Sequence, residues 1–380
     1  MKTSFRRTAW DVLVFLAIGL GPFIWPQPVA GQKITRENGV QVIHNPKDPV
    51  IRKGVPSTPV FKEDLVIGAE SGDEKYVFSN LQSMSVDDEG HIYVLDGTED
   101  TVRVFDGNGL HLRTFGKKGQ GPGEWDDPFR LSMTPSGELV ILDSGNSKIS
   151  YFSKTGRCLR ETPFGKHRIL RALVDEEGRI YGDQVVPKDS GIAFALARFD
   201  SKMNFQAPIA ETEPRKIVPG ESPMLLDRLA FKLLGGSRLA WANPKEYVIT
   251  IVHPEKGILR KIVKPFDRRK VTDQDKKDEI QSGYGNEPPV NTIFTFPEYY
   301  SPIYNLIADE KGSLYVQTNA KDAAGEIIHD VFDPEGVFIA RFALPASELL
   351  FAARAGKLYR MILENEAGTP QIKRCSLEWK

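Results

Sequence analysis

A tight turn followed by an apolar strand recurs six times in this chain of 380 residues, and no other feature constrains the fold as strongly. Five of the turns carry Gly, which adopts positive φ at no steric cost and therefore suits a hairpin. In the fourth copy Ser237 replaces Gly, so we expect a different turn there. The copies are DDEGHIYVLD (87–96), TPSGELVILD (134–143), DEEGRIYGDQ (175–184), LGGSRLAWAN (234–243), DEKGSLYVQT (309–318) and ARAGKLYRMI (353–362).

A second strand–turn–strand piece follows most of these copies, so that each full unit comprises four short antiparallel strands. Its clearest examples are VRVFDGNGLHLR (102–113), ISYFSKTGRCLR (149–160) and ITIVHPEKGILRK (249–261). Four strands in roughly 40–50 residues are typical of propeller blades. The sequence therefore predicts an all-β fold, a six-bladed β-propeller of four-stranded antiparallel blades.

The sixth unit is one strand short, because a single strand near 371–377 follows its first hairpin. The missing strand is expected at the other end of the chain, where PVFKEDLVI (59–67) reads as a lone strand. Pairing this N-terminal strand with the last blade would close the ring and cover an exposed edge. The propeller then spans 59–380.

The first 31 residues have the pattern of a signal peptide. Lys2, Arg6 and Arg7 precede an apolar run at 12–25, and Val-Ala-Gly at 29–31 offers a cleavage site. The alternative is a retained membrane anchor, but the run is shorter than the about 20 residues that span a bilayer. We therefore expect export to the periplasm or the medium, with 32–58 as an extended leader.

The stretch 264–301 exceeds the length of a plain blade and reads as an insertion. In VTDQDKKDEIQS (271–282), Thr272 and Asp275 have capping-box spacing, which predicts a short exposed helix. The following residues are rich in aromatics, among them Tyr299 and Tyr300. These side chains either offer flat surfaces for sugars or peptides or fill the space between blades 4 and 5.

The glycine-rich stretch FGKKGQGPGEWDDP (115–128) superficially resembles a phosphate-binding loop. A loop of that kind requires Lys and Ser or Thr at its end and a following helix, whereas Pro122 and a strand follow here. We therefore interpret the stretch as the connection between blades 1 and 2, with Trp125 packed against the blade. Such connections lie on the face that also carries the loops between second and third strands.

With six such units, this connection and an export signal, the chain resembles bacterial exported six-bladed propellers related to NHL repeats. DSGNSKISYF (143–152) is similar to the NHL core, in which Asp, Asn and a basic residue precede a strand. The resemblance covers about 60–380. It implies the fold and an exported location, while most members of the family have no assigned activity.

Candidate ligand-binding residues follow from the repeat. The residue seven positions before each turn Gly or Ser should lie at the start of the inner strand and face the propeller axis. By this rule Arg130 and Arg171 are neighbours on adjacent blades, and together they could bind an oxyanion. Alternatively, each pairs with an acid on a neighbouring blade. The positions in chain order are Ser83, Arg130, Arg171, Ala230, Asn305 and Leu349.

Asp96 and Asp143, which end second strands, suggest a lower-ranked cofactor, Ca²⁺, with Glu124 or Asn305 as further ligands. Alternatively, each Asp caps its own turn. We otherwise expect no cofactor and assign no catalytic residue. The His residues show no paired spacing, and no GxSxG motif is present.

Two functions remain. The favoured one is a binding or scaffold protein of the cell envelope that holds a peptide, glycan or envelope protein, with Arg130, Arg171, Asn305, Glu124, Tyr299 and Tyr300 as candidate contacts. The alternative is a lactonase-like hydrolase or lyase with a divalent metal at the axis. The formal net charge of −1 and the lack of a basic run argue against nucleic acid. We expect a monomer that meets the membrane only through its signal segment.

Overall fold

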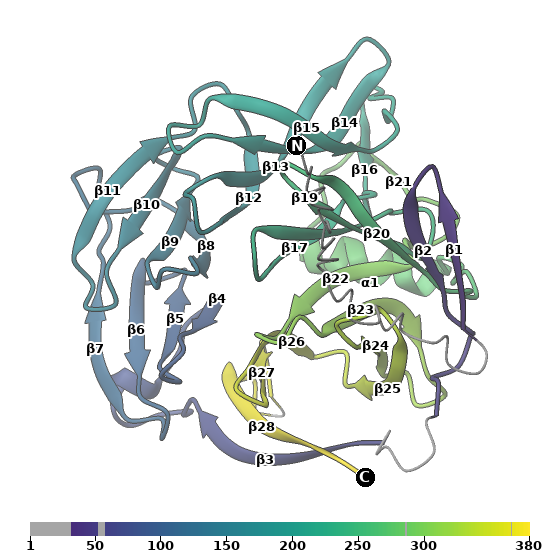
Figure 1. The fold of residues 1–380 in the computed structure, drawn as a ribbon. Coiled ribbons are helices and arrows are strands. Elements are labelled where there is room, and N and C mark those ends of the chain that lie inside the picture. Colours follow the sequence, from purple (N-terminus) through teal and green to yellow (C-terminus); the bar gives the residue numbers. More distant parts are fainter. Residues whose placement is uncertain (1–31, 52–57, 286, 366) are drawn as a thin grey trace, which may run out of the picture.

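The computed structural model describes residues 32–51, 58–285, 287–365 and 367–380, and the expected signal peptide lies outside these ranges. Six blades surround a central axis, with the first strand of each blade innermost (Figure 1). The predicted six-bladed β-propeller is thus confirmed. Among the described residues, no helix has both the length and the apolar character needed to cross a membrane.

The first three blades are consecutive antiparallel sheets. They consist of β4 (Leu81–Val86), β5 (Ile92–Asp96), β6 (Thr101–Phe105) and β7 (His111–Phe115); β8 (Pro128–Met133), β9 (Leu139–Asp143), β10 (Lys148–Phe152) and β11 (Cys158–Pro163); and β12 (Ile169–Val174), β13 (Ile180–Lys188), β14 (Gly191–Phe199) and β15 (Phe205–Glu211). A short 3₁₀ helix, η1 (Glu74–Tyr76), precedes blade 1.

The remaining blades consist of β17 (Ala230–Leu234), β18 (Arg238–Ala242), β19 (Val248–His253) and β20 (Gly257–Val263); β22 (Ile303–Ala308), β23 (Leu314–Lys321), β24 (Ile327–Phe332) and β25 (Phe338–Leu344); and β26 (Glu348–Arg354), β27 (Lys357–Ile362), β28 (Gln371–Trp379) and β3 (Pro59–Ile67). As predicted, the N-terminal strand β3 completes blade 6 by antiparallel pairing with β28.

The core lies between neighbouring blades. Tyr93 and Leu95 of blade 1 form one buried cluster with Leu139 and Ile141 of blade 2. Alternation along each strand directs such residues to both faces of the blade, so each blade contributes to two clusters. The rigid ring that results fixes where the inner strands and inter-blade connections lie.

The hairpin turns between first and second strands share one chemistry in blades 1, 3 and 5. The Asp87 carboxylate accepts hydrogen bonds from the backbone N–H groups of Glu89 and His91, and Asp175 repeats the pattern in blade 3. Gly90 adopts φ +84° in the same turn. In blade 4 the turn differs, as expected, because Ser237 itself adopts φ +55°.

Residues 33–44 do not form the expected extended leader. They fold into a hairpin of β1 (Lys33–Glu37) and β2 (Val40–His44), and β2 pairs in parallel with β20. The sheet of blade 4 thereby grows to six strands. The physical reason is burial: Val42 and Ile43 are almost fully buried, so these apolar residues in an otherwise polar segment have a place to pack.

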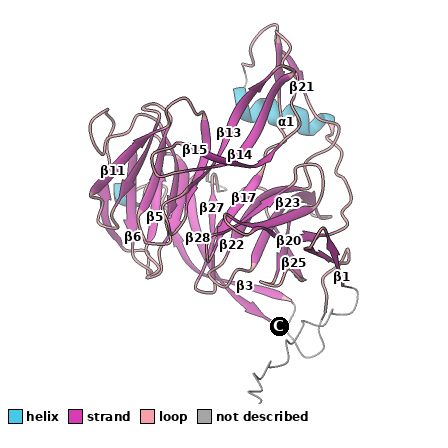
Figure 2. Ribbon diagram, turned by 45° about the horizontal axis from the view of Figure 1, so that its top comes forward, coloured by secondary structure: helices cyan, strands magenta, loops and turns pink. Residues whose placement is uncertain are grey.

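One side of the ring is raised over blades 3 to 5 (Figure 2). It comprises the long β13–β14 hairpin, the helix α1 (Asp273–Tyr284), and a parallel pair of β16 (Glu221–Pro223) with β21 (Ile293–Thr295). The predicted capping box is present, with Thr272 as the N-cap. This raised side carries the inter-blade connections.

Candidate functional site

The inner strands of five blades contain a register shift, and in four of them it lies near the start of the strand. In blades 2 and 3 the register shift places Arg130 opposite Leu142 and Arg171 opposite Asp183. Ser83 and Asn305 follow the equivalent shifts in blades 1 and 5. Counting back from the turn therefore found structurally equivalent positions in these blades. Ala230 and Leu349 are not equivalent, because β17 has no shift and that of β26 lies further along the strand.

Arg171 reaches from blade 3 to blade 4. Its Nη2 donates a hydrogen bond of 3.0 Å to the Leu229 carbonyl oxygen, and its guanidinium carbon lies 3.9 Å from the centre of the Phe231 ring. Its Nε is buried without a hydrogen-bond partner among the described residues. Two contacts thus fix the guanidinium while one donor stays unused.

Three further cations accompany Arg171. Arg228 directly precedes Leu229 in the chain and lies over the Phe194 ring of blade 3. Lys232 follows Phe231 on β17, and Arg130 is the counterpart of Arg171 in the preceding blade. Burial lowers the pKa of Arg171 to about 10; the charge of Asp183 opposes this shift, and repulsion from Arg130 and Arg228 adds to it. Burial and Arg171 likewise lower the pKa of Lys232. We call Arg130, Arg171, Arg228 and Lys232 the cation cluster.

Within the described part of the chain, Arg130, Arg228 and Lys232 have neither an ion pair nor a hydrogen bond from their side chains; Arg228 lies over the Phe194 ring at 5.5 Å. Arg130 and Arg228 are exposed, and Lys232 is half-buried. A cation that is not fully solvated is usually paired, so the lack of a counter-charge beside Lys232 is unusual. Sequence reasoning missed Arg228 and Lys232.

Among the charged groups described, Asp183 acts most strongly on Arg171. Asp183 is only 4% exposed and lies opposite Arg171 in the sheet. Burial raises the pKa of its carboxyl group, while the charges of Arg171 and Arg228 oppose the rise. Its Oδ1 is buried without a hydrogen-bond partner in the described structure. A single carboxylate cannot neutralise four cations.

Two acids on neighbouring blades that could have paired with Arg130 and Arg171, namely Asp96 and Asp143, are engaged elsewhere. Asp96 accepts hydrogen bonds from the backbone N–H groups of Ser79, Asn80 and Thr98. Asp143 accepts them from the backbone N–H groups of Asp126 and Asn146, and a further one from the Asn146 side-chain amide. Both carboxylates therefore hold backbone segments in place, as in the capping interpretation.

The connection between blades 1 and 2 has the expected structural role. Trp125 is fully buried and packs against Phe115 and Phe152. Glu124 accepts a hydrogen bond of 2.9 Å from the Gly121 N–H and forms an ion pair with Lys117. Both bonds lower the pKa of Glu124, and the bond from Lys117 has the larger effect. Glu124 thus stabilises its own loop.

Tyr299 and Tyr300 lie within the insertion, each beneath an arginine. The Arg268 and Arg269 guanidinium carbons are 4.3 and 4.2 Å from the two ring centres. Arg269 also forms an ion pair with Asp275 of α1 and donates a hydrogen bond to the Asn319 carbonyl oxygen of blade 5, so these contacts fix the helix to the propeller. Asn305 uses its Oδ1 to accept a hydrogen bond from the Leu306 N–H.

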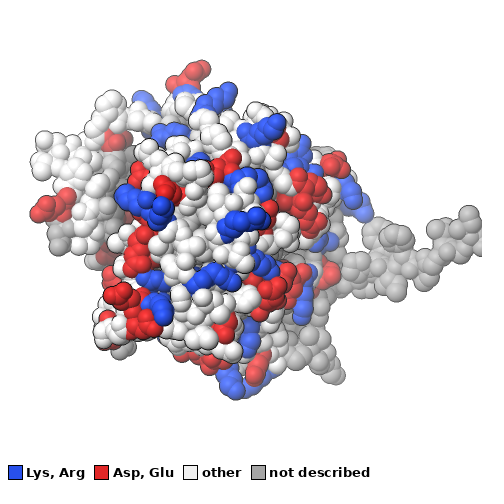
Figure 3. Space-filling view, turned by 90° about the vertical axis from the view of Figure 1, so that its left-hand side faces the viewer, with Lys and Arg blue, Asp and Glu red and all other residues white. Residues whose placement is uncertain are grey.

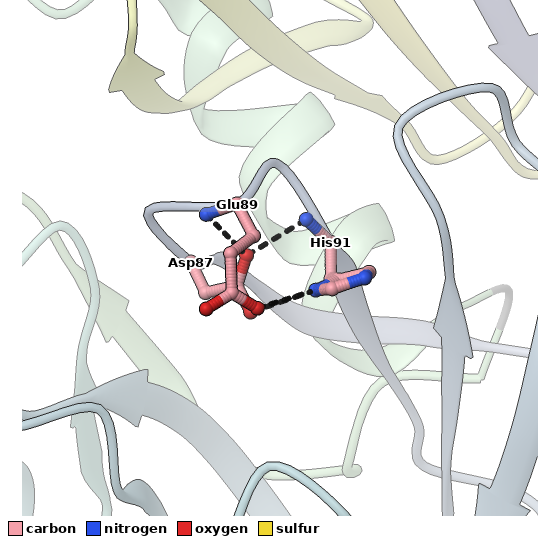
Figure 4. A group of neighbouring side chains, drawn as sticks. All are labelled: Asp87, Glu89 and His91. Atoms are coloured by element: carbon pink, nitrogen blue, oxygen red, sulfur yellow. Dashed lines mark hydrogen bonds and ion pairs between the residues drawn. The ribbon is translucent and has the colours of Figure 1, made fainter.

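Asp87, Glu89 and His91 bring three potential metal-ligand atoms within 4.8 Å of one another (Figure 4). The Asp87 carboxylate, however, already accepts hydrogen bonds from two backbone N–H groups, the Tyr93 hydroxyl and His91 Nδ1. In blade 3 the same pattern holds with Arg179, which cannot ligate a metal, in place of His91. The cluster is therefore a version of the repeated turn.

The outer side of the ring has a different charge pattern. In Figure 3, which views the molecule from the side of blades 1 and 2, basic and acidic side chains are interspersed. Many belong to ion pairs, such as that of Arg160 with Glu138. The concentration of cations without acids at the axis is thus a local property.

Comparison with known proteins supports the fold. Residues 72–218 match the DUF5128 family, described as a 6-bladed β-propeller. Human NHL repeat-containing protein 3 is 28% identical over 115 residues, which are 25% of this chain and 33% of that protein. The chain thus spans about a third of the length of this curated relative.

Solved structures of other proteins share this fold. A predicted exported protein from Bacteroides fragilis matches with a TM-score of 0.53 at 11% identity, covering 89% of this chain and 99% of its own. A DUF4221 family member from Bacteroides vulgatus matches with a TM-score of 0.53 at 14% identity, over 86% and 99% of the two chains. At such identities the likeness shows the fold alone. The chain is a six-bladed β-propeller that is similar to an NHL-repeat protein over part of its length, and the fold that the sequence resemblance implied is confirmed.

Proposed function

We propose that this protein is an exported binding protein of the cell envelope that holds an anionic ligand near the propeller axis. The ligand is an anionic glycan or peptide, or an acidic segment of an envelope protein. The single observation that carries the proposal is the cation cluster, in which Arg130, Arg228 and Lys232 have no acid partner among the described residues. The signal-like pattern of residues 1–31 supports export.

The position of the cation cluster suits binding. Its members come from three consecutive blades, so their relative placement is set by the ring rather than by a single loop. The connection between blades 3 and 4, which contains Arg228, also contains β16 of the raised side. A larger ligand or a partner protein would therefore contact the raised side, where Tyr284, Val290 and Ile293 are exposed.

The lactonase-like alternative predicts that several oxygen or imidazole ligands converge at the axis. The side chains that the structure groups there are cations, which would repel a divalent metal ion. We therefore expect a chelator to leave the melting temperature of residues 32–380 unchanged, and elemental analysis to find no stoichiometric metal. A bound metal whose removal lowers the melting temperature would favour the enzyme.

The direct test identifies what the protein carries. The wild-type protein and an Arg130→Gln/Lys232→Met double variant would be purified from the envelope of the producing bacterium, and released small molecules and glycans analysed by mass spectrometry. An anionic compound released by the wild type and depleted in the variant supports the proposal. The same compounds from both proteins, or none from either, would contradict it.

A further inference from the structure

The charges of the cation cluster specify more than a general preference for anions. Arg130, Arg171, Arg228 and Lys232 bring four positive charges, and Asp183 removes at most one. A single carboxylate on a ligand would leave most of this charge uncompensated, whereas a dianion would come close to neutralising it. The three guanidinium groups also present planar N–H forks, which match oxyanions.

We propose that the cation cluster recognises a dianionic oxyanion, a phosphate or sulfate group, on the ligand. This inference rests on the proposed binding function and names the chemical group that the same site would take. Arg171 is positioned in advance by the Leu229 carbonyl and the Phe231 ring, and its buried Nε still lacks an acceptor in the described structure. Donors that are already held in place lose little freedom when they bind an oxyanion.

The exposed and buried members of the cluster have different tasks. Lys232 is half-buried on β17 and lacks a counter-charge among the described residues, so an anion beside it would offset the cost of its desolvation. Arg130 and Arg228 are exposed and provide long-range attraction to the approaching anion. Replacing Lys232 with Met should therefore lower the association rate constant of the anion less than replacing Arg130 with Gln.

Tyr304 indicates what the group is attached to. It is the extra residue of the bulge on β22, it is 60% exposed, and an ionised hydroxyl at this position would raise the pKa of Arg171. An exposed aromatic face beside an oxyanion site suits a sugar ring. The bound phosphate or sulfate could be part of a sugar or could be the free inorganic ion, and binding measurements distinguish these two sources.

The test is isothermal titration of residues 32–380 with inorganic phosphate, sulfate, acetate, glucose 6-phosphate and glucose. We expect phosphate and sulfate to bind at least about tenfold more tightly than acetate, since one charge-assisted hydrogen bond contributes about that factor. Arg130→Gln and Lys232→Met should each weaken phosphate binding by about tenfold or more. Lys256→Met, an exposed lysine in the distant β19–β20 turn, is the matched control and should change nothing.

Tyr304→Ala separates the sources. If it weakens binding of glucose 6-phosphate but not of phosphate, the group is carried on a sugar; if it affects neither, the free ion is the ligand, and both results support the oxyanion site. Acetate binding as tight as phosphate binding would overturn the dianion inference and leave the binding function intact. Failure of every anion to bind would overturn both. Circular dichroism melts of each variant establish that it is folded.

Discussion

Trp125 fills the space above Gly116, so that a methyl group added to Gly116 would overlap its ring. Gly116 also adopts φ +92°, a conformation that costs a residue with a Cβ about 1–2 kcal/mol. We therefore expect Gly116→Ala to lower the free energy of unfolding by this cost plus about 1–3 kcal/mol for overpacking. Thermal and urea unfolding followed by circular dichroism measure the loss.

Gly178→Ala separates the two costs. Gly178 adopts φ +75° in the β12–β13 hairpin turn of blade 3, but nothing lies within 4 Å of the position of its Cβ. The Gly178→Ala variant should lose only the free energy that the backbone conformation costs, so it should be clearly more stable than the Gly116→Ala variant. Equal losses in the two variants would show that contact with Trp125 does not decide the requirement for glycine at 116.

Single residues also show how far the sequence predicts the site. Arg130 and Arg171 were found because a turn glycine stands at a fixed distance from the bulge in their blades. Lys232 was missed because blade 4 has neither that glycine nor the bulge, so the count ended at Ala230. The signal was nevertheless present: Lys232 is the one charged residue in the apolar strand AFKLL.

At the level of elements, β3 is fixed to blade 6 by charged groups as well as by backbone pairing. Asp64 accepts hydrogen bonds from Arg374, Lys357 and Ser376. Partial burial raises the pKa of Asp64, but the bonds from Arg374 and Lys357 outweigh this and lower it to about 2. An aspartate in an unfolded chain titrates near about 3.9.

The ion pairs of Asp64 make the stability of the closed ring depend on pH. Since the folded pKa lies below the unfolded one, the contribution is complete above about pH 4 and lost as the pH falls towards about 2. We expect Asp64→Asn to lower the free energy of unfolding at pH 7 by about 1–2 kcal/mol, allowing for solvent screening. Urea unfolding of the wild type and the variant would be measured at pH 7 and at about pH 2. If the difference in the free energy of unfolding between the two proteins were as large at about pH 2 as at pH 7, the stabilising role of the ionised Asp64 would be contradicted.

Elements differ in how well local sequence specifies them. Helix α1 was predicted because Thr272 and Asp275 satisfy the first turn through contacts three residues apart. The β1–β2 hairpin was not, because its partner β20 lies more than two hundred residues away and only burial against blade 4 selects it. Local chemistry determines a cap or a turn, whereas pairing between distant segments depends on the assembled ring.

At the level of the whole molecule, the ring holds together because its last strand comes from the beginning of the chain. Ile67 of β3 is buried with Phe78 and Leu81 of the first blade, and Phe61 packs edge-on against Phe342 of blade 5 at 4.8 Å. The strand therefore contacts both neighbours of blade 6 as well as β28. Without it, β28 would become an exposed edge and two inter-blade cores would open.

Two truncations test this role of β3. A chain that begins at Thr58 lacks the β1–β2 hairpin but keeps β3, and we expect it to remain monomeric with a cooperative though lower melting transition. A chain that begins at Ala69 also lacks β3, and we expect it to lose the cooperative transition and to aggregate through the free edge of β28. Size-exclusion chromatography and thermal melts distinguish the two. If the shorter chain melted like the longer one and stayed monomeric, closure by the N-terminal strand would not be what holds the six blades in one cooperative unit.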